Sequence, residues 1–132
     1  MKRLVSTLLA TLFLLTTPLL AKLSFQSQLS SITYLSDVSG HVGCTTWSIN
    51  KLKGLWVTAA HCVLEEPDPN TFYPGIMLRG KEVSLFRVDV PGDLAMVQVD
   101  VHESGLKLGN IPEVGDEAVV YGYPLGTPHP VA

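Results

Sequence analysis

The feature that most constrains the fold of this chain is a series of short apolar or alternating runs, rich in valine, separated by glycine, proline, asparagine and aspartate. Runs of this length, bounded by turn residues, are typical of β-strands and lack the periodicity of helices. We expect strands near residues 32–35, 42–49, 55–58, 76–79, 83–90, 95–99 and 118–121. This spacing predicts an all-β fold, either a small antiparallel barrel or a sandwich.

One of these runs favours the barrel. Residues 94–97, Leu-Ala-Met-Val, are apolar on both faces, whereas a sandwich strand with a solvated outer face alternates between apolar and polar residues. A closed barrel that packs against something else explains this pattern. A single helical turn is expected within residues 59–64.

The first 21 residues have the pattern of a secretory signal peptide. Lys2 and Arg3 supply the positive start, residues 4–17 carry no charge, and Ala21 supplies the small residue at the expected cleavage site. The alternative is an uncleaved membrane anchor, but the apolar stretch has about 17 residues against the roughly 20 that a spanning helix needs. We expect cleavage after Ala21, no stable membrane insertion afterwards, and a secreted or periplasmic protein.

The part that follows the expected cleavage site is acidic. The net charge of the whole chain is −3, and removal of Lys2 and Arg3 lowers it by two, to −5. A nucleic-acid partner or an anionic membrane surface is therefore not expected. The short acidic run at Glu65-Glu66 is most simply a solvated loop.

Two cysteines, Cys44 and Cys62, lie beyond the expected cleavage site. In an exported protein, two cysteines most simply form one disulfide. It would close a loop of about 19 residues and stabilise the fold by roughly 3 kcal/mol in the chain-entropy model. The alternative, two free buried thiols, requires a reducing compartment.

A histidine and an aspartate suggest acid–base chemistry. Residues 58–62, Thr-Ala-Ala-His-Cys, end an apolar run, and Asp93 follows a Pro-Gly turn and leads into an apolar strand. Acyl transfer by a serine nucleophile needs a neutral imidazole to accept a proton and a carboxylate to fix its tautomer. Taken singly, such a histidine is more often structural, and such an aspartate is more often a turn residue.

Together these residues resemble the chymotrypsin-fold (trypsin-like) family of serine proteases. Gly43-Cys44 followed by residues 57–62 is similar to the family's histidine motif, and residues 93–95 (Asp-Leu-Ala) are similar to its aspartate motif. Residues 114–126 resemble the sixth strand and following turn of HtrA-like and other compact bacterial members. The resemblance covers roughly residues 38–126.

The resemblance implies that residues 22–126 form the first, six-stranded barrel of a two-barrel peptidase whose active site lies between the barrels. It implies that His61 is the general base and later the general acid, that Asp93 orients it, and that a Cys44–Cys62 disulfide braces the turn. The Asp93 carboxylate should then lie within hydrogen-bond reach of Nδ1 of His61. A protein or peptide substrate is implied, without a cofactor or a metal ion.

The family's nucleophilic serine has no counterpart in the sequence. No Gly-x-Ser-Gly-Gly motif occurs among the 132 residues. Ser104 follows Asp93 too closely, and Ser39 precedes His61, which is the wrong order for the family. We expect the chain alone to be inactive, because loss of one triad member costs on the order of 10⁴ in rate.

Three hypotheses remain open from the sequence. In the first, the chain is the N-terminal portion of a trypsin-like serine endopeptidase, and residues 127–132 are a truncated linker towards a second barrel or a partner chain. In the second, it is a secreted, non-catalytic single-barrel homologue that acts as a binding module, and in the third it is a structural β-protein with an accidental motif. A zinc site built from His41, Cys44, His61 and Cys62 lacks the usual ligand spacing and would need both thiols free.

Overall fold

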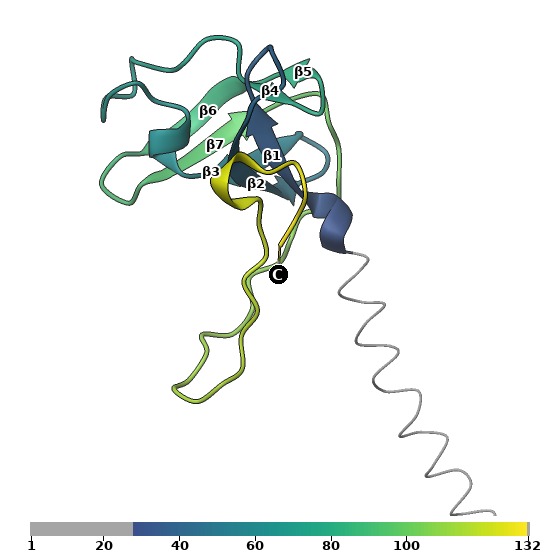
Figure 1. Cartoon of the computed structure of the whole chain (residues 1–132). Helices are drawn as coiled ribbons and strands as arrows, with labels where there is room; N and C mark the ends of the chain where they lie inside the picture. Colours follow the sequence, from purple (N-terminus) through teal and green to yellow (C-terminus); the bar gives the residue numbers. More distant parts are fainter. Residues whose placement is uncertain (1–27, 132) are drawn as a thin grey trace, which may run out of the picture. The chain divides into compact units, whose positions relative to one another are not determined.

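The computed structural model describes residues 28–131, so the expected signal peptide at residues 1–21 lies outside the described part. The described residues form β-strands and short 3₁₀ helices (Figure 1). The strands are β1 (Ile32–Ser36), β2 (Val42–Asn50), β3 (Leu55–Thr58), β4 (Met77–Leu78), β5 (Lys81–Glu82), β6 (Ser84–Asp89) and β7 (Leu94–Gln98). The 3₁₀ helices are η1 (Leu29–Ser31), η2 (Ala60–Cys62) and η3 (Pro124–Gly126). The expected all-β class and the helical turn after β3 are both confirmed.

The strands form one antiparallel sheet with the order β5-β4-β1-β2-β3-β7-β6, and this sheet curls around the core (Figure 1). Its two edge strands, β5 and β6, are consecutive in the chain and are separated only by Val83. Val83 is buried, and its N–H donates to the carbonyl of Ile76 at 2.9 Å. The chain itself therefore connects the two edges of the sheet, which is consistent with the small barrel that the sequence predicts.

Trp56 on β3 is the largest fully buried side chain of the core. Its indole Nε1 donates to the carbonyl of Val101 at 3.0 Å, and the guanidinium carbon of Arg79 lies 5.6 Å from the ring centroid. The other core residues are Leu35, Ala60, Val63, Leu64, Ile76, Leu78, Val83, Ala95, Val97 and Val99. Four buried hydroxyls donate to carbonyls, as Thr46 does to Val57 at 2.8 Å, and the others are those of Ser31, Ser48 and Thr58. The interior is thus packed around an aromatic ring whose polar atom has a partner.

The prediction of a strand at residues 118–121 is wrong. Residues 107–120 leave the barrel, extend away from it and return without pairing to any strand (Figure 1). Val119 and Val120 are 65% and 85% exposed, and Gly122 makes only an isolated bridge to Val131. An apolar run of this kind becomes a strand only where a neighbouring strand supplies its hydrogen-bond ladder.

The chain after this excursion returns to β2. The Tyr123 N–H donates to Oγ1 of Thr45 at 2.9 Å, and the Tyr123 ring meets that of Tyr34 edge-on, with centroids 5.1 Å apart. Gly122 lies so close to Thr45 that a Cβ atom built on it would be 2.9 Å from Oγ1. Residues 122–131 are therefore anchored on the outside of β1 and β2.

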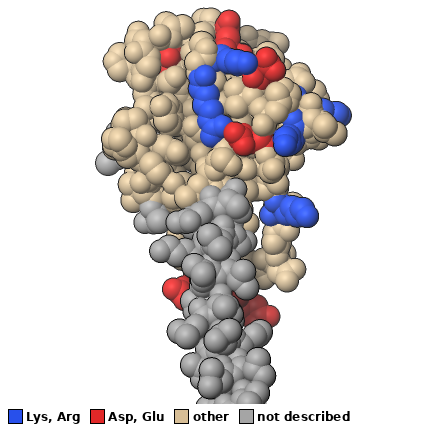
Figure 2. Space-filling model, turned by 90° about the vertical axis from the view of Figure 1, so that its right-hand side faces the viewer, with Lys and Arg blue, Asp and Glu red and all other residues tan. Residues whose placement is uncertain are grey.

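The face shown in Figure 2 carries acidic and basic side chains close to one another and no extended patch of one sign. Two of the ion pairs join Arg79 to Glu103 at 2.9 Å and Lys81 to Asp100 at 3.1 Å. Within residues 28–131, no helix has both the length and the apolar character needed to cross a membrane.

The hydrogen bonds of His102 lead us to expect that the stability of the barrel depends on pH. Its Nδ1 lies 2.6 Å from the carbonyl oxygen of Lys51, and its Nε2 lies 3.0 Å from Oδ1 of Asp100, which also pairs with Lys81. Both ring nitrogens thus face hydrogen-bond acceptors. The Lys51 carbonyl has the larger effect and the Asp100 carboxylate the next largest, and both raise the pKa of His102 above 6.5. Because the folded state binds the proton more tightly, this stabilisation is complete below about pH 6.5 and is lost as the pH rises through the folded pKa.

We therefore predict that His102→Gln lowers the melting temperature more at pH 5.5 than at pH 8.5. Thermal unfolding followed by circular dichroism at the two pH values measures this difference. His129→Gln is the matched control, because the His129 side chain has no hydrogen bond or ion pair within residues 28–131. An equal loss for His102→Gln at both pH values would show that the ring acts by packing and not through its charge.

Candidate active site

His61 is presented by a short turn that is anchored on both sides. β3 ends at Thr58, and η2 follows, with the Val63 N–H donating to the carbonyl of Ala60 at 3.1 Å. Ala60 and Val63 are buried in the core, whereas the side chain of His61 between them is 72% exposed. The packing of its neighbours therefore turns the imidazole outwards.

Asp93 lies at the end of the turn that joins β6 to β7. Its N–H donates to the carbonyl of Val90 at 3.1 Å, and its φ of 53° is in the left-handed region, which aspartate tolerates better than most residues. Its own carbonyl accepts the Ala60 N–H at 3.1 Å. A backbone hydrogen bond thus joins the β6–β7 turn to the η2 segment, in addition to any contact between side chains.

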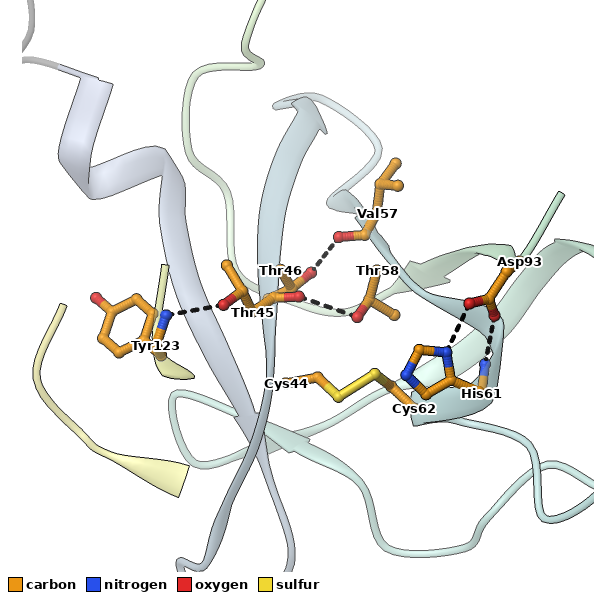
Figure 3. Close-up of a disulfide and its surroundings, with 9 residues drawn as sticks. All are labelled: Cys44, Thr45, Thr46, Val57, Thr58, His61, Cys62, Asp93 and Tyr123. Carbon is orange, nitrogen blue, oxygen red and sulfur yellow. Dashed lines mark hydrogen bonds and ion pairs between the residues drawn. A yellow bond between two sulfur atoms is a disulfide. The ribbon is translucent and has the colours of Figure 1, made fainter. Parts of the chain in front are cut away.

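The Asp93 carboxylate makes two hydrogen bonds to His61. Its Oδ2 lies 2.6 Å from Nδ1 of the imidazole, and its Oδ1 accepts the backbone N–H of the same residue at 2.9 Å (Figure 3). This confirms the expected proximity of the two side chains. The hydrogen bond from the backbone N–H of His61 has the largest effect on the pKa of Asp93, and the hydrogen bond to the His61 side chain has the next largest. Both lower this pKa below 3.8, so the carboxylate is ionised at neutral pH.

This geometry selects one tautomer of the imidazole. A carboxylate facing Nδ1 favours the form in which Nδ1 carries the hydrogen, so Nε2 holds a lone pair. Nε2 has no hydrogen-bond partner within residues 28–131. The ring can therefore accept a proton at Nε2 while the carboxylate stabilises the cation that results.

The expected disulfide is present. Cys44 on β2 and Cys62 in η2 are bonded, with their Cα atoms 6.2 Å apart (Figure 3). The bond connects a central strand to the turn that carries His61. It also leaves neither thiol for the zinc site considered from the sequence.

We predict that the double variant Cys44→Ser/Cys62→Ser loses about 3 kcal/mol of unfolding free energy, because the unfolded chain is no longer constrained by a cross-link over 18 residues. Urea unfolding measures this loss. Wild-type protein reduced with dithiothreitol should unfold at the same urea concentration as the variant. A variant that unfolds together with the oxidised protein would show that the cross-link contributes no stability.

A cavity of about 220 Å³ adjoins the pair, and both His61 and Asp93 form part of its wall. The remaining lining residues are Ala60, Leu64, Glu65, Glu66, Pro67, Tyr73 and Val90. The sequence alone gave Glu65 and Glu66 no role beyond a solvated loop, and it did not single out Tyr73. For the two glutamates the available signal was their position four and five residues after His61 (65 − 61 = 4, 66 − 61 = 5), whereas no such signal marks Tyr73.

A second histidine–aspartate pair repeats the same pattern. Oδ2 of Asp37 lies 2.9 Å from Nδ1 of His41, and Oδ1 of Asp37 accepts the His41 N–H at 2.9 Å. This pair belongs to the connection between β1 and β2. The His41 N–H, followed by its side chain, lowers the pKa of Asp37. The hydrogen bonding of His61 is thus a local motif that occurs twice, and it does not by itself define a catalytic residue.

Neither rejected serine is joined to His61. The backbone N–H of Ser39 donates to Oδ1 of Asp37 at 2.9 Å, and the carbonyl of Ser104 accepts the hydroxyl of Ser31 at 2.5 Å. Within residues 28–131, His61 has no serine as a hydrogen-bond partner.

Comparison with known proteins gives no assignment. The chain matches no protein-family model, no curated protein and no solved structure, so the functional argument depends on the geometry of His61, Asp93 and the cavity beside them.

Proposed function

We propose that this chain supplies the histidine–aspartate half of a trypsin-like serine endopeptidase. The observation that supports this most strongly is that the histidine and the aspartate of the two family-like motifs meet, with Nδ1 of His61 2.6 Å from Oδ2 of Asp93 and Nε2 unpaired beside a cavity. The similar pair of Asp37 and His41 also lines a cavity but lies outside those motifs. A serine hydroxyl delivered to this face from a second barrel or a partner chain would complete a triad. Protein or peptide substrates would occupy the cleft so formed.

In this proposal, Nε2 of His61 accepts the serine proton as the hydroxyl attacks the scissile carbonyl, and it later gives that proton to the leaving amine. Asp93 stays ionised throughout and stabilises the imidazolium that forms between the two steps. Its second hydrogen bond, to the backbone N–H of His61, prevents the carboxylate from rotating away from Nδ1. The oxyanion donors, like the serine, would come from the completing part.

A secreted or periplasmic location is part of the same proposal. The Cys44–Cys62 disulfide supports it, because disulfides form and persist in oxidising compartments. The pattern of residues 1–21 points to the same compartments.

The coding sequence beyond the Ala132 codon tests the proposal. We expect a Gly-x-Ser-Gly motif within about the next hundred codons, since a second barrel is of ordinary domain size, and we expect the extended product to react with a fluorophosphonate probe. His61→Ala in that product should abolish the reaction. The 132-residue chain itself should remain unlabelled. Unrelated downstream sequence, or a label on Ser39 or Ser104, would contradict the proposal.

One observation favours a second candidate function, that of a binding module without catalysis. The apolar side chains of Leu108, Ile111 and Val114 are each at least 92% exposed. Exposed apolar groups of this kind are typical of surfaces that bind a partner. The two candidates differ in what they require of His61. A binding module would keep its partner affinity in a His61→Ala variant, whereas the peptidase would lose its reaction.

A further inference from the structure

We propose that the cavity beside His61 receives a basic side chain of the substrate, a lysine or an arginine, with Glu65 and Glu66 as its counter-charges. This inference rests on the proposed peptidase function and adds a substrate class to it.

The size of the cavity fits one side chain. Its volume of about 220 Å³ is below the roughly 300–1,000 Å³ typical of pockets for whole small molecules, yet several times the ~30 Å³ share of one water molecule. His61 and Asp93 are part of its wall. A side chain held here therefore belongs to a residue next to the bond on which the imidazole would act.

The lining suits a side chain with an apolar stem and a charged head. Leu64, Pro67 and Val90 offer apolar surface, and Glu65 and Glu66 add carboxylates to the same wall. Lysine and arginine bury their methylene stems along apolar surface while the charged end remains near water. An acidic side chain is disfavoured here by repulsion, and a purely apolar one leaves the carboxylates without a partner.

The charge of this wall is not neutralised by the protein. Within residues 28–131, neither Glu65 nor Glu66 forms an ion pair, and no lysine or arginine is among the lining residues of the cavity. The third carboxylate of the wall, Asp93, already faces His61. A cation in the cavity would thus meet two carboxylates that have no competing partner.

The two glutamates are held in place by the loop that bears them. The Glu65 N–H donates to the carbonyl of Thr71 at 2.8 Å, and the Thr71 hydroxyl donates to the carbonyl of Glu66 at 2.9 Å. The Tyr73 N–H then donates to the carbonyl of Val63, beside η2, at 2.8 Å. The loop therefore keeps both glutamates on the side of His61.

Titration of the full-length, disulfide-bonded chain with two small probes tests the inference without any catalytic turnover. The probes are Nα-acetyl-lysine amide and Nα-acetyl-norleucine amide, which differ in the ammonium group. The backbone amide signals of Leu64 and Val90 report occupancy by NMR. At low ionic strength we expect the lysine probe to bind about five-fold more tightly, the effect of one strong exposed ion pair, and the difference to shrink in 0.5 M NaCl.

Matched variants identify the carboxylates. Glu65→Gln/Glu66→Gln should remove the preference for lysine and leave the affinity for norleucine unchanged. Glu113→Gln/Glu117→Gln removes the same charge from exposed positions outside the cavity and should retain the preference. Equal binding of the two probes, absence of binding, or a preference that survives the Glu65/Glu66 variant would each overturn the inference.

The result is separable from the peptidase proposal. If the extended product hydrolyses peptides without any lysine preference at this cavity, the peptidase proposal is supported and the inference about the cavity is wrong. If the chain binds lysine selectively but its extended product never reacts with fluorophosphonate, the peptidase proposal is wrong and the cavity remains a site for basic ligands.

Discussion

Asp93→Asn should lower kcat/KM for peptide hydrolysis about 10⁴-fold in the proposed protease, assembled with its serine-bearing part. The asparagine Oδ1 can still accept the backbone N–H of His61, as Oδ1 of Asp93 does at 2.9 Å, so the turn should keep its shape. The other atom becomes an NH₂ donor that faces Nδ1. Nδ1 must then act as an acceptor, the ring hydrogen moves to Nε2, and Nε2 can no longer take the serine proton.

The second histidine–aspartate pair provides the control for this experiment. Asp37→Asn makes the same chemical change in the same hydrogen-bonding pattern, but at His41. It should change kcat/KM no more than about two-fold, since the Asp37 carboxylate bonds to Ser39 and His41 and not to His61. A loss below ten-fold for Asp93→Asn, with unaltered circular dichroism, would show that Asp93 does not set the tautomer of a catalytic base.

Trp56→Ala should have the largest effect on stability, a loss of about 3–5 kcal/mol of unfolding free energy. Trp56 is fully buried, so truncation leaves a cavity in the core and deprives the Val101 carbonyl of its hydrogen bond. This loss is a large part of the roughly 5–15 kcal/mol of a typical domain. Urea unfolding monitored by far-ultraviolet circular dichroism measures it, because that signal survives the loss of the indole.

A smaller change keeps this prediction testable if Trp56→Ala does not fold. Trp56→Phe retains most of the volume and removes the N–H, so a loss of about 1–3 kcal/mol is expected from the unsatisfied carbonyl. Trp47, the chain's other tryptophan, is only half-buried on β2. Trp47→Ala should cost clearly less than Trp56→Ala, and equal losses would mean that burial does not govern stability here.

Much of the site could be predicted from the sequence because its residues lie in short motifs with strict local geometry. The disulfide was predicted from the presence of two cysteines in a chain expected to be exported, and the contact between His61 and Asp93 was predicted from a family resemblance. The repeat of the same contact at Asp37 and His41 could not be foreseen, because it depends on how the connection between β1 and β2 folds. The position of Glu65 in the same cavity wall as His61 depends likewise on the hydrogen bonds of its loop.

The fold was predictable where apolar or alternating runs have neighbouring strands. β2, β3 and β7 coincide with such runs, and β3 pairs with both β2 and β7 in the sheet. The two-residue strand β5, Lys81–Glu82, was missed because it has no apolar alternation and depends on a tight turn in which Arg79 and Gly80 have positive φ values of 48° and 78°. The prediction of a strand at residues 118–121 was wrong for the opposite reason, because this apolar segment has no neighbouring strand with which to pair.

The left-handed backbone of Asp93 has a consequence for how this protein can change during evolution. With φ at 53°, position 93 accepts glycine, asparagine or aspartate far more readily than a branched or bulky residue. A relative that lacks the proposed proton transfer can therefore keep an intact barrel with Asn or Gly at this position, whereas Val or Ile would also destabilise the fold. Among relatives that retain the barrel without the proposed chemistry, we expect Asn or Gly at position 93.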